Sequence, residues 1–371
     1  MKPQTKMLFV FLSLLLAANL ACAGLAAAPT ATPTAAPTTI PTKTPPPTQK
    51  PAPPAVPTKS TFELDKKIHN HPSGAFSYHP PVGWDIQETN YDAYITDPIS
   101  GVFFYVSVTN TGIPLDAASY KNLVNYTDNF YYSTFDDYKQ TDYYVSDTKD
   151  VYALQKTYTF EGKTQFVQSV YNQFGQVTYI FELLGTESVI KSNPDFQAGF
   201  DEFISSLEVI LEPAATLPIY EPSWNFVGPE NSMSISVPIG WEYVYDDHQT
   251  YTDSVIESLT SPDGTAVIEN ISVVDGNAYT MGNAGQVALF LLNDRYSSGG
   301  GDVRVLDIKT LNDGSEFWTW KSSKGGYSGT TNFELRNGGK QILLLSFLAN
   351  DATLDLYNPL FLRVIGTYAI P

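Results

Sequence analysis

The sequence predicts an α+β protein of two tandem domains, each with a central antiparallel β-sheet flanked by helices. The first observation is an internal repeat: the segment FSYHPPVGW at residues 76–84 is similar to the segment MSISVPIGW at residues 233–241. The second is that apolar and polar residues alternate in runs joined by short turns, which is typical of hairpins and therefore of antiparallel neighbours. The third is that segments with helical spacing of apolar residues recur at matching places in both halves.

Residues 1–22 are predicted to be a signal peptide. Two lysines precede the apolar run Met7–Ala18, which is shorter than the roughly 20 residues that a spanning helix needs. Cys22 follows Ala21 at a site that resembles a lipobox, and we expect Cys22 to be lipidated there. Leu20 departs from the usual order, and Ala21-Cys22-Ala23 also fits ordinary signal cleavage. The sequence therefore predicts an exported protein of the cell envelope or cell surface, held by a lipid anchor or otherwise secreted.

Residues 23–60 are predicted to be a Pro/Thr-rich disordered stalk. Eleven of the 26 prolines fall within residues 29–58, and no aromatic side chain does. Such a segment cannot bury enough surface to offset its chain entropy, and it acts as an extended spacer. No cysteine follows Cys22, so the folded part is expected to be stabilised without disulfides.

The charge of the chain narrows the range of partners. Residues 59–211 and 212–371 each carry a net charge of −11, within a total of −18. Nucleic acids and anionic lipid surfaces attract lysine and arginine. We therefore expect no nucleic-acid partner, and membrane contact through the lipid anchor only.

The first domain is assigned to residues 61–211. An alternating strand around Phe76 and Tyr78 leads into a Pro-x-Gly turn, and the next strand opens with Trp84. The hairpin TDPISGVFFYVSV follows, and then a helix for which Asp116 is the expected N-cap. The predicted buried stripe of this helix consists of Tyr120, Leu123, Val124, Thr127 and Tyr131.

Strands resume after this helix as VYALQKTYTF and TQFVQSVYNQFGQVTYIFELL, the latter folded at a turn around Phe174-Gly175. An amphipathic helix closes the domain against the sheet. Its predicted apolar positions are Phe196, Phe200, Phe203, Ile204 and Leu207.

The second domain is assigned to residues 226–371, after a linker at residues 212–225. It repeats the order of the first, with the hairpin TSPDGTAVIENISVV and the strands EFWTWKSS and GTTNFELRNGGKQILLLSFLA. Its first helix, Asn283 to Tyr296, is apolar over more of its circumference, and we expect it to be covered on more sides. The predicted apolar positions of its closing helix are Tyr357, Phe361, Val364, Ile365 and Tyr368.

The order of these elements resembles the PsbP-like α/β/α sandwich, a group that includes DcrB-like bacterial lipoproteins. The resemblance rests on the strand that enters Pro-x-Gly-Trp, the antiparallel hairpins with one inserted helix, and the closing helix that ends in FISSLEV. It implies an exported and often lipid-anchored protein that acts as an accessory or binding module without catalysis. It implies no cofactor, and no functional residue is carried over from it.

The candidate binding surface lies in the tyrosine-rich residues 125–145. Tyr126 and Tyr132 fall off the predicted helical stripe, and Tyr143 and Tyr144 are consecutive in a strand, so that at least one of them faces away from the core. Tyrosines interleaved with aspartates suit an envelope protein with a basic surface, a cationic peptide or a glycan. The alternative is ordinary tyrosine coverage of a half-exposed sheet.

The sequence predicts no catalytic residue and no metal site. His69 and His71 are interpreted as a solvated loop before the first strand. Asp246, Asp247 and His248 are interpreted as a polar loop, because no Gly-x-Ser-x-Gly elbow accompanies them. Two further hypotheses stay open: a secreted hydrolase that uses the His248 loop with a nucleophilic serine, and a pure surface spacer or scaffold.

Overall fold

Two seven-stranded antiparallel sheets with the same strand order form the framework of the protein. The computed structural model describes residues 62–228, 233–246, 254–298 and 301–369, and the predictions for Cys22 and His248 lie outside these residues. The first sheet has the order β3-β4-β5-β9-β8-β7-β6. Its strands are β3 (Asp85–Glu88), β4 (Asp92–Thr96), β5 (Phe103–Asn110), β6 (Asp136–Val145), β7 (Val151–Phe160), β8 (Lys163–Phe174) and β9 (Val177–Thr186).

The second sheet has the order β13-β14-β15-β19-β18-β17-β16, so each strand has a counterpart in the first. Its strands are β13 (Glu242–Asp246), β14 (Ser254–Thr260), β15 (Ala266–Val273), β16 (Val303–Thr310), β17 (Glu316–Ser322), β18 (Tyr327–Arg336) and β19 (Gln341–Asn350). The predicted α+β architecture of two antiparallel sheets is thereby confirmed.

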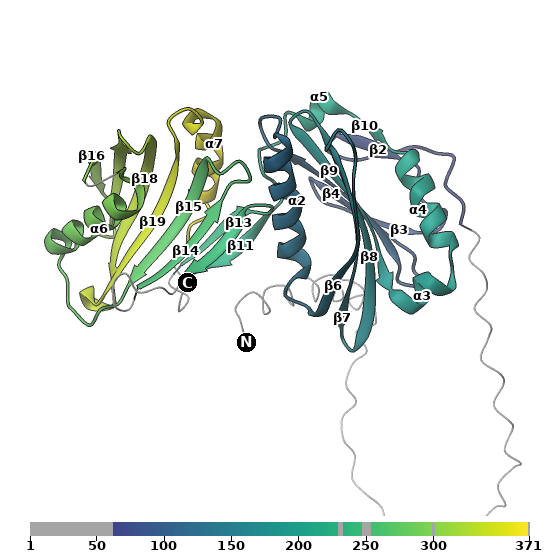
Figure 1. Ribbon diagram of the computed structural model, residues 1–371, viewed down its shortest axis with the longest axis horizontal. Helices are drawn as coiled ribbons and strands as arrows, with labels where there is room; N and C mark the ends of the chain where they lie inside the picture. Colours follow the sequence, from purple (N-terminus) through teal and green to yellow (C-terminus); the bar gives the residue numbers. More distant parts are fainter. Residues whose placement is uncertain (1–61, 229–232, 247–253, 299–300, 370–371) are drawn as a thin grey trace, which may run out of the picture. The chain divides into compact units, whose positions relative to one another are not determined.

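Helices cover both faces of each sheet, which gives the predicted α/β/α layering (Figure 1). In the first domain α2 (Ala117–Tyr132) lies on one face, and α3 (Glu187–Ser192) and α4 (Asp195–Ser205) lie on the other. In the second domain α6 (Met281–Tyr296) and α7 (Leu354–Ile365) take the places of α2 and α4. The Asp116 side chain accepts hydrogen bonds from the Ala118 and Ser119 amides at the start of α2, so the predicted N-cap is confirmed.

Two smaller sheets and two short helices complete the described fold. The smaller sheets are β1-β2-β10 and β11-β12. Their strands are β1 (His69–Asn70), β2 (Phe76–Tyr78), β10 (Glu208–Val209), β11 (Ser223–Val227) and β12 (Ser234–Pro238), and the short helices are α5 (Leu211–Ala214) and η2 (Asn337–Gly339). Strand β11 begins at Ser223, inside the segment 212–225 that the sequence assigns to a linker.

The repeated Pro-x-Gly-Trp phrase has the same structural role in both domains. Gly83 and Gly240 have φ angles of +80° and +85°, a conformation in which other residues are strained. The tryptophan that follows packs on the closing helix each time, with ring centroids 6.3 Å apart for Trp84 and Phe196 and 5.7 Å apart for Trp241 and Tyr357. The two tryptophans therefore occupy equivalent places.

The two faces of the first sheet differ in polarity. On β5, Phe104 and Val106 belong to the apolar core on the α4 side, whereas Ser107 and Thr109 line the space below α2. This follows the two-residue period of a strand. The first domain therefore keeps an apolar core under α4 and a partly polar interior under α2.

Helix α6 does not have the extensive cover that its composition predicts. Its buried residues are Ala284, Ala288, Leu291, Leu292 and Tyr296, which form a single stripe. Phe290 is 52% exposed, so the expectation of cover on more sides is wrong. The small side chains Ala284 and Ala288 let the helix approach the sheet closely, and apolar residues beside the stripe remain at the surface.

Candidate functional site

The four tyrosines of the predicted binding surface are divided between the surface and the interior. Tyr143 and Tyr144 on β6 are 40% and 59% exposed. Tyr126 on α2 is half-buried, and burial followed by the charge of Glu242 on β13 raises the pKa of its hydroxyl. The surface that remains is the pair on β6.

Tyr132 is buried, so the prediction that it lies off the inward-facing side of α2 is wrong. It is 5% exposed, and its hydroxyl donates a hydrogen bond of 2.6 Å to Glu182 on β9. The residue beside it, Tyr131, lies in the predicted stripe but is only partly buried. Burial, followed by the charge of Glu182, raises the pKa of Tyr132 well above its ordinary value.

Strand β6 is an edge strand with an acidic and aromatic surface. It pairs with β7, and among the described residues no strand pairs with its other edge. Asp136, Asp137 and Asp142 are exposed along it together with the two tyrosines. The register with β7 is interrupted twice before Asp142 and is continuous from Asp142 to Val145. The two tyrosines therefore lie on the regular part of the strand.

The corresponding edge strand of the second sheet, β16, has a different surface. Leu306 and Ile308 are 64% and 50% exposed there, and the register with β17 shifts between Val305 and Asp307. A β-bulge of this kind distorts the edge strand and so opposes its pairing with a strand of another chain. The tyrosines and most of the acidic side chains of β6 are thus absent from β16, its counterpart in the second sheet.

A buried ionic cluster lies between α2 and the first sheet. Lys156 on β7 is fully buried, and its Nζ contacts the Asp128 carboxylate of α2 and lies 3.6 Å from Glu182 Oε1. Ser169 donates a hydrogen bond of 2.5 Å to Glu182, and Tyr138 donates one of 2.5 Å to Asp128. Sequence reasoning missed this cluster. Its signal was present, because Lys156 shares the inward-facing parity of Leu154 on β7.

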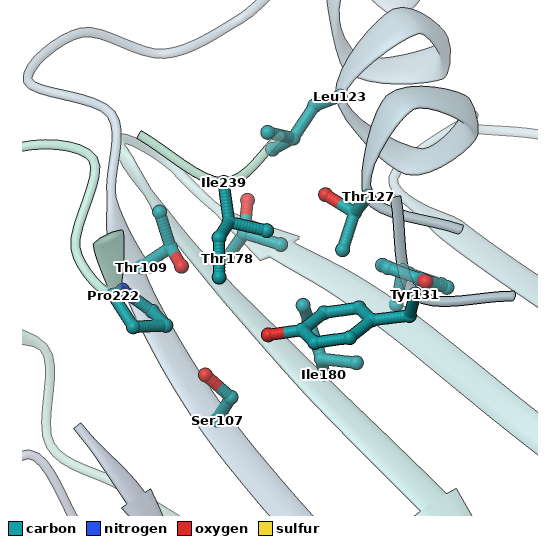
Figure 2. Close-up of a pocket in the computed structure, with 10 residues that line it drawn as sticks. Ser107, Thr109, Leu123, Thr127, Tyr131, Thr178, Ile180, Pro222 and Ile239 are labelled. Atoms are coloured by element: carbon teal, nitrogen blue, oxygen red, sulfur yellow. The ribbon is translucent and has the colours of Figure 1, made fainter. Parts of the chain in front are cut away.

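The cavity below α2, with its lining residues shown in Figure 2, is too small for an organic ligand. Its volume is about 10 Å³, which is room for about one water molecule. Leu123, Thr127 and Tyr131 line it from α2, and Thr178 and Ile180 line it from β9. We interpret it as a packing space and not as a binding site.

The histidines before the first sheet are structural, and the prediction of a solvated loop is wrong. His69 lies in β1 with its Nε2 3.0 Å from Glu88. His71 is 2% exposed and stacks on Phe76 at a centroid distance of 4.2 Å. Its Nδ1 is hydrogen-bonded to Ser73 at 2.7 Å, and burial lowers its pKa.

Metal-binding clusters and membrane-spanning helices are absent from the described part of the chain. In residues 62–228, 233–246, 254–298 and 301–369 no group of three or more His, Cys, Asp or Glu side chains has a metal-binding arrangement. Within the same ranges no helix combines the length and the apolar character needed to cross a membrane.

Neither a protein-family model nor a curated protein matches the chain, but solved structures do. The cyanobacterial PsbP of Synechocystis is 14% identical, with a TM-score of 0.31 over 42% of this chain and 99% of its own. LpqN of Mycobacterium tuberculosis, which is involved in cell envelope biogenesis, is 14% identical, with a TM-score of 0.26 over 38% of this chain and 90% of its own. The immunity protein TplEi of Pseudomonas aeruginosa is 11% identical, with a TM-score of 0.21 over 78% of this chain and 97% of its own. A PsbP structure is among these matches.

Proposed function

We propose that the protein is an envelope-anchored, non-catalytic binding lipoprotein of two PsbP-like domains, and that the edge of β6 binds a basic, extended segment of another envelope protein. The observation that carries this proposal is the exposure of Tyr144, and on the opposite face of Tyr143, on an acidic edge strand where Asp142 shares the face of Tyr144. Lipidation at Cys22 would hold the protein in the envelope, and residues 23–60 would carry the folded part away from the membrane.

Charge complementarity favours a basic ligand. Strand β6 contains Asp136, Asp137 and Asp142 against the single cation Lys139. A lysine or arginine of the ligand can approach these carboxylates and lie over a tyrosine ring at the same time. An exposed cation–π contact contributes about 0.5–1 kcal/mol, so several such contacts are needed for measurable affinity.

Side chains contribute more to this recognition than a continuous backbone ladder. The Tyr143 amide already donates a hydrogen bond of 2.8 Å to the Asp142 side chain. A ligand strand would therefore find the amide of Tyr143 occupied, although edge strands are common sites of strand addition. We expect moderate affinity that falls as salt is added.

The other two hypotheses receive less support. A pure spacer predicts no solvent-facing aromatic side chains in this part of the first domain, whereas Tyr143 and Tyr144 are 40% and 59% exposed. The hydrolase hypothesis depends on His248, which lies outside the described residues, and no described feature favours it. A glycan would stack on the same tyrosines without contacting the aspartates. Titration with an oligosaccharide and with peptides of opposite charge distinguishes a glycan from a basic peptide.

The test uses Tyr144→Ala with Tyr245→Ala as its matched control, because Tyr245 is 55% exposed on β13, an edge strand of the second sheet. The full-length protein is titrated by calorimetry with a peptide of alternating lysine and threonine, with its glutamate counterpart, and with a chitin oligosaccharide. We expect binding of the lysine peptide, weakened about 2–5-fold by Tyr144→Ala and unchanged by Tyr245→Ala. Equal binding of both peptides, or equal effects of the two variants, would contradict the proposal. Binding of the oligosaccharide alone would replace the basic peptide with a glycan.

A further inference from the structure

The buried cluster of Lys156, Asp128 and Glu182 brings together the components of an amide-forming reaction. The three residues are 0%, 3% and 5% exposed, and they come from β7, α2 and β9. Lys156 Nζ contacts Asp128 Oδ1, and Glu182 Oε1 is 3.6 Å away. The Tyr132 ring lies over Nζ at 3.9 Å. An amine, a carboxyl group and a second carboxylate are therefore held together away from water.

We propose that Lys156 and Asp128 condense into an intramolecular isopeptide bond, with Glu182 as the proton acceptor. A proton first passes from the Lys156 ammonium to the Asp128 carboxylate, and the amine then attacks Asp128 Cγ. Glu182 takes a second proton from the nitrogen and returns it to the departing hydroxyl group. One C–N bond forms, one C–O bond breaks and one water molecule leaves, so the reaction needs no oxidant, cofactor or activated substrate.

The neighbouring hydroxyl groups support this reaction. Tyr138 donates a hydrogen bond of 2.5 Å to Asp128 Oδ2, the oxygen on which negative charge would build up during attack, and such a donor stabilises an oxyanion. Ser169 and Tyr132 donate to the two oxygens of Glu182 at 2.5 and 2.6 Å, which orients its carboxylate. Fixing the reacting groups in contact gives a very high effective concentration, and the closed site excludes water.

The second domain shows that the fold does not require this cluster. The equivalent hairpin pairs are Thr96 with Phe103 and Thr260 with Val267. When the paired residues are followed from strand to strand, starting at these hairpins, the same number of steps ends at Lys156 in the first sheet and at Trp320 in the second. Trp320 therefore occupies the position of Lys156.

The other positions of the cluster are also uncharged in the second domain. Leu292 occupies the place of Asp128 in the helix, and Ser346 occupies the place of Glu182. Tyr296, the counterpart of Tyr132, stacks on Trp320 at 5.5 Å. Because apolar residues can replace buried ion pairs without loss of stability, packing alone does not account for the charges in the first domain.

The bond would join helix α2 to strand β7 in domains that contain no cysteine. Such a cross-link restricts the unfolded chain in the same way as a disulfide does. It would also resist reducing agents, which a disulfide does not.

The experiment is peptide mass spectrometry on the purified full-length protein after denaturation and digestion. We expect one branched peptide that contains Lys156 and Asp128 and is lighter by one water than the sum of its two arms. Lys321 and Asp351 serve as an internal control, because their 2.8 Å ion pair is 41% exposed on both sides and should remain unlinked. Two separate, unmodified peptides from folded wild-type protein would overturn the proposal.

Two variants test the roles of the side chains. Glu182→Gln keeps the amine and the carboxyl group but removes the proton acceptor, and we expect the two arms to remain separate. Asp128→Asn keeps the shape of the site, and its condensation would release ammonia in place of water. The branched peptide would then have the same mass as that of the wild type, because the same amide forms. A full cross-link in Glu182→Gln would refute the role of Glu182. Circular dichroism checks that each variant folds, and if neither does, the wild-type peptide map alone decides the proposal.

Discussion

The two glycines of the repeated turn provide a matched test of how α2 packs. Gly83 and Gly240 have nearly the same positive φ angle, so alanine at either position costs about 1–2 kcal/mol of backbone strain. At Gly83 an added Cβ would meet no atom within 4 Å. At Gly240 it would lie 2.6 Å from Leu123 Cδ1 and 2.9 Å from Thr127 Oγ1. Overpacking of this kind adds about 1–3 kcal/mol.

We therefore expect Gly83→Ala to lower the free energy of unfolding by about 1–2 kcal/mol and Gly240→Ala by about 2–5 kcal/mol. Urea unfolding followed by circular dichroism measures both changes. Leu123→Ala in the Gly240→Ala background should recover part of the loss, because it removes the atom closest to the added methyl group, and a double-mutant cycle isolates this coupling. Equal destabilisation by the two glycine substitutions, without coupling to Leu123, would refute the packing of this turn against α2.

Two further predictions concern pH dependence and anchoring. Burial raises the pKa of Glu257 above its ordinary value of 4.5, so its charged form opposes folding at neutral pH and this penalty disappears as the pH falls to about 4.5. Glu257→Gln should therefore raise the melting temperature at neutral pH and lose this advantage near pH 4.5; an advantage that does not change with pH would contradict the assignment. Cys22→Ser should move the protein from the membrane fraction to the soluble fraction of a bacterial host, and a variant that stays membrane-bound would exclude Cys22 as the anchor.

Most of the fold could be predicted because its signals are local. Alternating runs such as VYALQKTYTF coincide with β7, and the turn at Phe174-Gly175 lies where β8 ends. Because the two domains repeat the same order of elements, each helix or strand assigned in one domain predicted its counterpart in the other. Strand order was less accessible, because the pairing of β5 with β9 joins segments that α2 and three strands separate.

The candidate site was predicted only in part, because tertiary partners decide where side chains point. Helical spacing leaves Tyr132 off the stripe, yet a hydrogen bond to Glu182, far along the chain, holds it in the interior. For Tyr143 and Tyr144 on β6, the alternation of side chains along a strand requires only that one of them point away from the core. The edge position of β6 exposes both. The charged cluster around Lys156 was detectable from strand parity alone, but its carboxylate partners were not.

The difference between Lys156 and Trp320 bears on how tandem copies avoid misassembly. Neighbouring domains with one topology are liable to exchange segments while they fold. If α6 docked on the first sheet, Leu292 would cover Lys156 and leave an ammonium group buried without its carboxylate from the helix. If α2 docked on the second sheet, Asp128 would meet the indole of Trp320. The first hybrid leaves Lys156 with Glu182 as its only carboxylate, and the second buries Asp128 without a partner. Breaking a buried ion pair costs several kcal/mol, so sequence divergence between the two interiors favours each helix on its own sheet.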